Sequence, residues 1–390
     1  MTPAARIAAA SEVLDKVLAG AAAEQALTGW ARGARYAGSG DRAAVRDHVF
    51  DALRRLRSAA ARGGGMTGRA VMIGLLRERG EEPGAYFTGQ GHAPAPLSDE
   101  EARAGRSPEG AEAMDLPDWL WTLLREAEGD ERAADLALQL RERAPVMLRV
   151  NLRKGARADA INMLAEDGVD AAPDSISPTA LKVNSGARRI RAARAYTNGL
   201  VELQDGASQS VVDELRLVNG MKVLDFCAGG GGKTLAMAAR ADIELFAHDA
   251  DPGRMRDLPQ RALRAGATVR QVTLDDARTL APFDLVLCDA PCSGSGAWRR
   301  APDAKWRLDP DALARLQALQ DQILDQAATL VAQDGTLAYA TCSILGPEND
   351  ARVDAFLARH ETWTTQARRH WDPGPSGDGF FVAQLLRRRD

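Results

Sequence analysis

The chain has 390 residues, 45% of them hydrophobic and 27% charged, and its formal net charge is −4. This length predicts two or three domains, and the composition is that of a soluble globular protein. No apolar run approaches the roughly 20 residues that a bilayer-spanning helix requires, so we expect no membrane span. Charged residues such as Arg6 and Glu12 interrupt the Ala-rich start before a secretory apolar segment forms, and we therefore expect a cytoplasmic protein.

The four cysteines all lie in the C-terminal half of the chain, without CxxC or CxxH spacing. They are Cys227, Cys288, Cys292 and Cys342. This pattern predicts free thiols in a reducing compartment, with neither a disulfide framework nor a metal site. The five histidines show no metal-ligand spacing either.

Charge is distributed unevenly along the first third of the chain. Residues 1–70 contain eleven Lys and Arg against six Asp and Glu, whereas residues 71–130 contain five against thirteen. A second basic cluster lies within residues 182–194. Arginines gathered on one face would neutralise phosphates and supply sequence-independent affinity for nucleic acid. The alternative is that these arginines simply lie on solvent-exposed helix faces.

The N-terminal part of the chain has the apolar periodicity of helices, as in Val45, Val49 and Leu53. Glycine- and proline-rich breaks separate further helical segments, and we expect a helical domain over residues 1–135. Short β-prone runs around a helix-like segment follow. They predict a small α+β module over residues 136–210.

From Met221 onward, apolar strands alternate with glycine-rich turns and helix-length segments. The expected strands cover residues 223–226, 243–247, 269–272, 284–288 and 336–340. This alternation predicts an α/β domain with a mostly parallel, doubly wound sheet over residues 211–390. Ligands of such sheets bind beyond the carboxyl ends of the strands, and each motif below follows such an end.

A glycine-rich turn follows the first expected strand and opens a helix. It runs Asp225-Phe226-Cys227-Ala228-Gly229-Gly230-Gly231-Gly232-Lys233-Thr234. Four glycines allow close backbone approach and positive φ angles, so we expect a nucleotide-like ligand against Cys227 to Lys233. The ending Gly-Lys-Thr superficially resembles a phosphate loop, but a phosphate loop needs a glycine where this chain has Cys227.

Aspartates follow the next two expected strands. Asp249 ends the second strand, where a carboxylate accepts hydrogen bonds from both hydroxyls of a ribose. At the end of the third strand, Asp276 is expected to meet an adenine amino group. The alternative for each aspartate is a helix N-cap, but acidic residues at successive strand ends favour a ligand.

Two further motifs carry a family resemblance. The first is Asp289-Ala290-Pro291-Cys292-Ser293-Gly294-Ser295-Gly296, which resembles the fourth motif of the Sun/RsmB (NOL/NOP/Sun) family of RNA cytosine-C5 methyltransferases. The second is Tyr339-Ala340-Thr341-Cys342-Ser343 with Pro347-Glu348-Asn349, which resembles the sixth motif of that family. The glycine-rich turn is similar to the first motif, with Gly230 where the family usually has proline.

The resemblance implies a Rossmann-like class I methyltransferase domain that binds S-adenosyl-L-methionine. It also implies that a small RRM-like module and an N-terminal, all-helical NusB-like RNA-binding domain precede this domain. The implied substrate is small-subunit (16S) ribosomal RNA. We expect RNA as the partner, no DNA, and a monomeric protein.

The resemblance also assigns roles to the two motif cysteines. Carbon 5 of cytosine does not take a methyl group until a thiolate has added to carbon 6. The family resemblance makes Cys342 this nucleophile and gives Cys292 the release step, in which the proton on carbon 5 leaves. Asp289 is expected to contact ring nitrogen 3 as the adduct forms, and to touch the cofactor. The thiols of Cys227 and Cys288 are interpreted as structural, because free cysteines are often buried.

Aromatic and basic residues follow the fourth motif. Trp298, Trp306 and the pair Arg299-Arg300 are expected to stack on or clamp RNA near the target base. Helix packing is an equally good account of Trp306.

Four other functions compete with this hypothesis. A tRNA cytosine-5 methyltransferase and a non-catalytic RNA-binding assembly factor would both retain the fold. A DNA cytosine methyltransferase would use the cysteine of its Pro-Cys motif as nucleophile and would not need Cys342. A nicotinamide-dependent oxidoreductase would need a G-x-G-x-x-G turn, which is not found in the usual place. The presence of both Cys292 and Cys342 favours RNA methylation.

Overall fold

The computed structural model describes residues 1–388, which fold into two compact units. The first unit comprises Met1–Arg143 together with Trp298–Leu308. The second begins at Ala144, is interrupted by this segment, and continues from Asp309. None of the helices within the described residues combines the length and apolar character needed to cross a bilayer.

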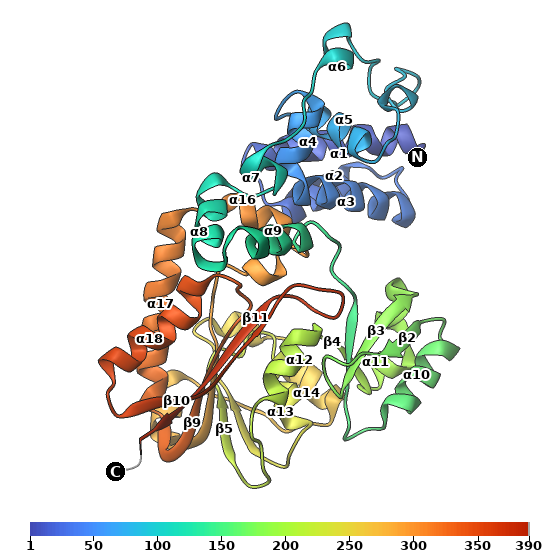
Figure 1. Cartoon of the computed structure of the whole chain (residues 1–390). Helices are drawn as coiled ribbons and strands as arrows, with labels where there is room; N and C mark the ends of the chain where they lie inside the picture. The colour runs from blue at the N-terminus through green and yellow to red at the C-terminus, as the bar shows by residue number, and fades with distance from the viewer. Residues whose placement is uncertain (389–390) are drawn as a thin grey trace. The chain divides into compact units, whose positions relative to one another are not determined.

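The first unit is built from helices around one apolar core (Figure 1). Its helices are α1 (Pro3–Leu18), α2 (Ala23–Gly33), α3 (Ser39–Arg54), α4 (Leu56–Gly63), α5 (Gly68–Glu78), η1 (Pro83–Ala85), α6 (Asp99–Arg103), α7 (Gly110–Ala113), α8 (Asp118–Glu128), α9 (Asp130–Gln139) and α16 (Pro302–Arg307). Val13 of α1, Val49 of α3 and Val71 of α5 are fully buried in the core. Helices α4 and α5 pack closely because Gly74 has no side chain: a Cβ there would lie 1.8 Å from the Ala59 carbonyl oxygen.

The segment Trp298–Leu308 belongs to the first unit although it follows the Cys292 motif in sequence. Trp298 is buried, and the indole Nε1 of Trp306 donates to the Leu53 carbonyl oxygen at 2.7 Å. Trp298 therefore lies inside the protein, and Trp306 packs against the core of this unit. The sequence contains no boundary signal for this insertion. Of the two accounts given for Trp306, RNA contact and helix packing, the structure shows helix packing.

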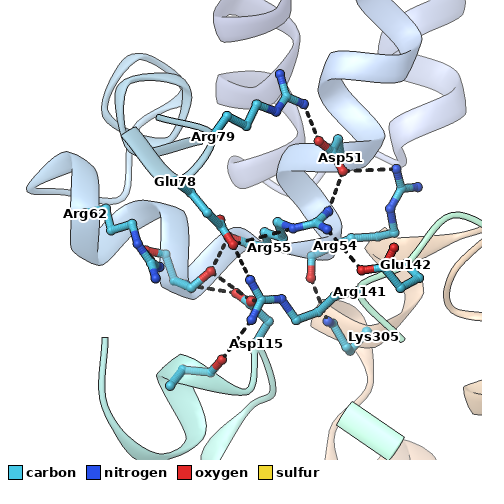
Figure 2. A network of polar contacts seen from close by, with 12 residues as sticks. Asp51, Arg54, Arg55, Arg62, Glu78, Arg79, Asp115, Arg141, Glu142 and Lys305 are labelled. Atoms are coloured by element: carbon cyan, nitrogen blue, oxygen red, sulfur yellow. Dashed lines mark hydrogen bonds and ion pairs between the residues drawn. The ribbon is translucent and has the colours of Figure 1, made fainter. Parts of the chain in front are cut away.

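The opposite charges of the first 70 and the next 60 residues meet inside the first unit (Figure 2). The ion pairs that join the two segments are Arg55–Glu78, Arg57–Asp118, Arg69–Glu101 and Arg79–Asp51. In the same unit Asp115 is fully buried, where it accepts hydrogen bonds from Ser58 and lies 3.1 Å from Arg141 Nε. Much of the uneven charge is thus paired within this unit. The pairing compensates the cost of burying Asp115 away from water.

The second unit contains two sheets. The smaller sheet has the order β2-β3-β1-β4 with antiparallel neighbours throughout, and the chain order is the βαββαβ of a ferredoxin-like module. Its elements are β1 (Met147–Val150), α10 (Arg157–Glu166), β2 (Asp170–Pro173), β3 (Ala180–Ser185), η2 (Ala187–Ala192), α11 (Arg194–Thr197) and β4 (Val201–Leu203).

The larger sheet has seven strands in the order β10-β11-β9-β8-β5-β6-β7. These are β5 (Lys222–Asp225), β6 (Glu244–Ala247), β7 (Arg270–Gln271), β8 (Phe283–Asp289), β9 (Val331–Thr341), β10 (Trp363–Trp371) and β11 (Phe380–Arg387). Strands β5 to β9 pair in parallel, which confirms the expected doubly wound sheet. The antiparallel hairpin of β10 and β11 completes it beside β9.

Helices cover both faces of the larger sheet (Figure 1). They are α12 (Gly206–Asp213), α13 (Gly232–Ala238), η3 (Pro252–Met255), α14 (Leu258–Ala265), α15 (Leu274–Leu280), η4 (Ser295–Ala297), α17 (Pro310–Ala328), η5 (Gly346–Glu348) and α18 (Asp350–Arg359). Consecutive residues of β8 face opposite sides: Val286 packs in the core that includes α17 and α18, and Leu287 in the core that includes α12 and α13. Burial on both faces holds the strand ends in fixed positions.

Candidate active site

The site lies at the carboxyl edge of the larger sheet, where four neighbouring parallel strands end. Asp225 ends β5, Asp249 follows β6, Asp289 ends β8 and Cys342 follows β9. Because parallel strands present their carboxyl ends at one edge, residues far apart in sequence meet there. The structure thus brings most of the residues expected from the sequence together.

The glycine-rich turn between β5 and α13 adopts a conformation that suits glycine. Gly229 has a φ of +50° and Gly231 a φ of +78°, and a Cβ on Gly231 would lie 2.3 Å from Leu258 Cδ1. The Ala228 amide donates to the His248 carbonyl oxygen at 2.8 Å. The turn is therefore tied to the end of β6, and its backbone leaves room for a ligand.

The carboxylate of Asp249 is buried and held by its neighbours. It accepts hydrogen bonds from the Gly229 amide at 2.8 Å and from the Asp251 amide at 3.0 Å. Arg254 Nη1 lies 3.3 Å from Oδ2. These contacts fix Asp249 at the rim of the glycine-rich turn, which is the position expected for a ribose acceptor.

A cavity of about 420 Å³ opens beside Asp249. Its lining consists of Phe226, Cys227, His248, Asp249, Ala250, Arg254, Leu274, Pro291, Leu319, Gln322, Ile323 and Gln326. The size and the mostly apolar lining with one fixed carboxylate are those of a pocket for a nucleoside-sized ligand. Four of these residues come from α17, far along the chain, and no local motif in the sequence marked them.

Asp225 lies fully buried beneath the glycine-rich turn. Its Oδ2 accepts a hydrogen bond from Thr234 Oγ1 at 2.6 Å, and its Oδ1 has no hydrogen-bond partner among the described residues. Burial raises the pKa of Asp225 to about 7, although the bond from Thr234 acts in the opposite direction. An unsatisfied buried oxygen at this point is consistent with a site that a polar ligand completes.

Lys233 connects the glycine-rich turn to the end of β8. Its Nζ donates to Asp289 Oδ2 at 2.7 Å and lies 4.7 Å from the centre of the Phe380 ring. Lys233 is buried, whereas the Asp289 side chain is about one-third exposed, at 32%. Asp289 is therefore anchored from below and still reaches the open side of the site.

The two motif cysteines lie against each other. The Sγ atoms of Cys292 and Cys342 are 3.4 Å apart, and both side chains are partly exposed. The contact with Cys342 and burial raise the pKa of the Cys292 thiol well above its usual value, and the nearby Glu348 carboxylate acts in the same direction. Each of these causes disfavours the ionised form of Cys292.

Asp276, Cys288 and Cys227 lie in three different surroundings. Asp276 caps α15: its Oδ2 accepts from the Thr273 amide at 3.0 Å, and it is exposed and does not line the cavity. Burial raises the pKa of Cys288 and Cys227, so both remain thiols at neutral pH. Cys288 lies in the sheet core, whereas Cys227 lines the cavity. No group of three or more potential metal ligands occurs among residues 1–388.

The fold and this edge define a Rossmann-like methyltransferase domain joined to a ferredoxin-like module. Residues 212–386 match the family model described as 16S rRNA methyltransferase RsmB/F. Residues 116–188 match the model of the ferredoxin-like domain of RsmF/B-like methyltransferases. The chain belongs to the RsmB/F methyltransferase family.

Curated relatives carry the name ribosomal RNA small subunit methyltransferase B. The protein from Xanthomonas campestris pv. campestris is 34% identical over 300 residues, which are 72% of this chain and 68% of the relative. The protein from Citrobacter koseri is 36% identical over 290 residues, and that from Photorhabdus laumondii 34% over 286. In the latter two the match covers 70% of this chain and 66% of the relative's own length.

Two solved structures share the fold. The crystal structure of PH0851 superposes with a TM-score of 0.76 and 24% identity, covering 99% of both chains. The structure of NSun6 from Pyrococcus horikoshii with SFG gives a TM-score of 0.62 and 18% identity, covering 70% of this chain and 99% of that one. At these identities the likeness concerns the fold.

Proposed function

We propose that the protein is an S-adenosylmethionine-dependent RNA cytosine-C5 methyltransferase that acts on small-subunit (16S) ribosomal RNA through a covalent cysteine adduct. The observation that carries this proposal is the 3.4 Å contact between Cys292 and Cys342 beside the Lys233–Asp289 pair. The names of the curated relatives support the ribosomal substrate. The chemistry of carbon-5 methylation accounts for the paired thiols.

The residues of the edge fit the cofactor. We propose that Asp249 binds the ribose hydroxyls, that the Cys227–Lys233 turn gives close backbone contact, and that the cavity of about 420 Å³ takes the base; the fixed Asp249 carboxylate and the cavity beside it support this. The orphan oxygen of Asp225 adds a buried acceptor below the turn. Bound S-adenosylmethionine supplies the methyl group that carbon 5 takes.

In the addition step, the Cys342 sulfur attacks carbon 6 of a cytosine extruded from its stack. The electron pair of the 5,6 double bond moves toward carbon 5 and the ring, and nitrogen 3 becomes more basic. Nitrogen 3 takes up a proton from solvent and shares it with the Asp289 carboxylate, which Lys233 keeps in place. The Cys292 sulfur lies 3.4 Å from the attacking sulfur of Cys342 and is within hydrogen-bond distance of it.

In the release step, a base takes the proton from carbon 5. The 5,6 double bond re-forms, and the bond between carbon 6 and the Cys342 sulfur breaks. Once Cys342 is bound as a thioether, it no longer carries the charge that opposes ionisation of Cys292. Cys292 is assigned to the removal of the carbon-5 proton, as the base or as a helper of the base. The same contact thus serves both halves of the reaction.

Bisulfite sequencing of total RNA at base resolution tests this function, in cells with and without the gene and in cells that carry Cys342→Ala. Loss of one methylated cytosine in 16S rRNA, in both the deletion and the variant, is the expected result. Loss confined to a tRNA would identify a tRNA enzyme instead. An unchanged map would contradict RNA methylation and favour an assembly factor.

A further inference from the structure

A buried carboxylate lies between the loops that carry the two cysteines. Glu348, at the end of η5, has no exposed surface. Its Oε1 accepts from the Ser293 amide at 2.8 Å and from Gln320 Nε2 at 3.1 Å. Its Oε2 accepts from the hydroxyls of Ser343, at 2.6 Å, and of Ser293. Four donors thus compensate the desolvation of this charge.

The serine donors are the immediate neighbours of the sulfurs in sequence. Ser293 follows Cys292 on the loop after β8, and Ser343 follows Cys342 on the loop after β9. One carboxylate therefore holds both loops. Gln320 of α17, the remaining residue that donates to Glu348, also donates to the Pro291 carbonyl oxygen at 2.9 Å. It thereby attaches the Cys292 loop to α17.

We propose that Glu348 is a positioning residue that holds the Cys292 loop against the Cys342 loop and places a negative charge near Cys292. The proposal rests on the cysteine mechanism given above. Glu348 reaches the sulfurs through its hydrogen bonds and its charge, without touching substrate. Its negative charge raises the pKa of Cys292, as the contact with Cys342 and burial also do.

Glutamine at this position separates charge from packing. An amide oxygen in the place of Oε1 still accepts from the Ser293 amide and Gln320, and an amide nitrogen in the place of Oε2 donates to the two serine hydroxyls. Glu348→Gln therefore retains the shape and removes the charge. Glu348→Ala removes the clamp itself.

The charge is tested by alkylating Cys292 with iodoacetamide across a pH series, in a Cys342→Ala background, with peptide mass spectrometry to separate the cysteines. Glu348→Gln should lower the pH at half-maximal alkylation by about one unit, a roughly tenfold change in the thiolate equilibrium. Thr179→Val removes a buried hydroxyl that donates to Gln209 and should leave this pH unchanged. An unchanged pH in Glu348→Gln would overturn the proposed charge effect.

The clamp is tested by the rate at which diamide joins Cys292 to Cys342. Each thiol gives up one proton and one electron as the sulfur–sulfur bond forms, and the N=N bond of diamide takes up both protons and both electrons to become a hydrazine. Folded Glu348→Ala should react about tenfold more slowly than Thr179→Val. An equal rate would overturn the clamp, and if Glu348→Ala does not fold, Ser293→Ala is used with the same two outcomes.

These assays need neither RNA nor cofactor, so they fail independently of the proposed function. In methylation assays Glu348→Gln should lower kcat by about tenfold and leave KM for RNA within about twofold, because it alters the sulfurs and not the RNA surface. A change confined to KM would contradict a positioning role.

Discussion

The ammonium group of Lys233 and the carboxylate of Asp289 form an ion pair of 2.7 Å that joins the glycine-rich turn to the end of β8. The cation is buried and the carboxylate is partly open to the site. One residue of the cofactor turn thus orients the side chain proposed to meet the target base. This contact connects the two halves of the site.

Removing the cation should therefore impair chemistry. Lys233→Met should reduce kcat/KM for methylation by roughly 10- to 100-fold, which corresponds to about 1.5–3 kcal/mol for a hydrogen bond to a charged group. Lys222→Met is the matched control, because Lys222 lies at the start of β5 and donates to the Leu280 carbonyl oxygen. Initial rates on an rRNA fragment measure both variants, and equal rates in the two would contradict the role of the pair.

Cofactor affinity should depend on Asp249. Asp249→Ala should weaken the binding of S-adenosylhomocysteine by roughly tenfold or more, since a charged acceptor for the ribose is lost. Asp251→Ala is the control, because Asp251 is exposed, bonds to its own Gly253 amide at 2.9 Å and does not line the cavity. Isothermal titration calorimetry measures both, and a similar loss in Asp251→Ala would show a general effect on the loop.

Asp225 should make stability depend on pH. The folded protein keeps the proton on Asp225 up to about pH 7, whereas the unfolded chain loses it near pH 4. The folded state is therefore progressively penalised as pH rises from 4 to 7. Asp225→Asn does not ionise, so its thermal midpoint relative to the wild type should rise between pH 5 and pH 8. A difference in midpoint that does not change with pH would contradict the raised pKa of Asp225.

Lys305 gives a second pH dependence, in the first unit (Figure 2). Burial lowers the pKa of Lys305 to about 7, although the Asp115 carboxylate acts in the opposite direction. The folded state is destabilised by the bound proton below pH 7, and this penalty fades as pH rises toward the usual lysine value. The thermal midpoint of Lys305→Met, measured relative to that of the wild type, should therefore rise as pH is lowered from 9 to 7. Scanning fluorimetry measures both midpoints. A constant difference would contradict the burial.

Local patterns in the sequence predicted the parallel sheet and its edge. The turn before Lys233 and the residues after each strand are recognisable because strand ends, glycines and short motifs are contiguous in the chain. Asp276 shows why one residue type leaves alternatives open: the same position suits a ligand contact or a helix cap, and Asp276 takes part in the capping box of α15.

Other parts of the site depend on contacts between distant segments. The face of α17 that lines the cavity with Leu319 and Ile323 carries no motif of its own. Glu348 was visible as part of a motif, but its hydrogen bonds to both cysteine loops depend on how those loops fold together. The packing of Trp298–Leu308 into the first unit likewise follows from tertiary contacts, with no change in local pattern at either end.

The central claim is that Cys342 bonds to the target cytosine and that Cys292 releases it. The most direct measurement is a denaturing gel of Cys292→Ala after incubation with small-subunit rRNA and S-adenosylmethionine. We predict a slowly migrating protein–RNA adduct that is absent from the wild type and from Cys292→Ala/Cys342→Ala. An adduct that persists without Cys342, or its absence from Cys292→Ala while the wild type methylates the same RNA, would contradict the assigned roles.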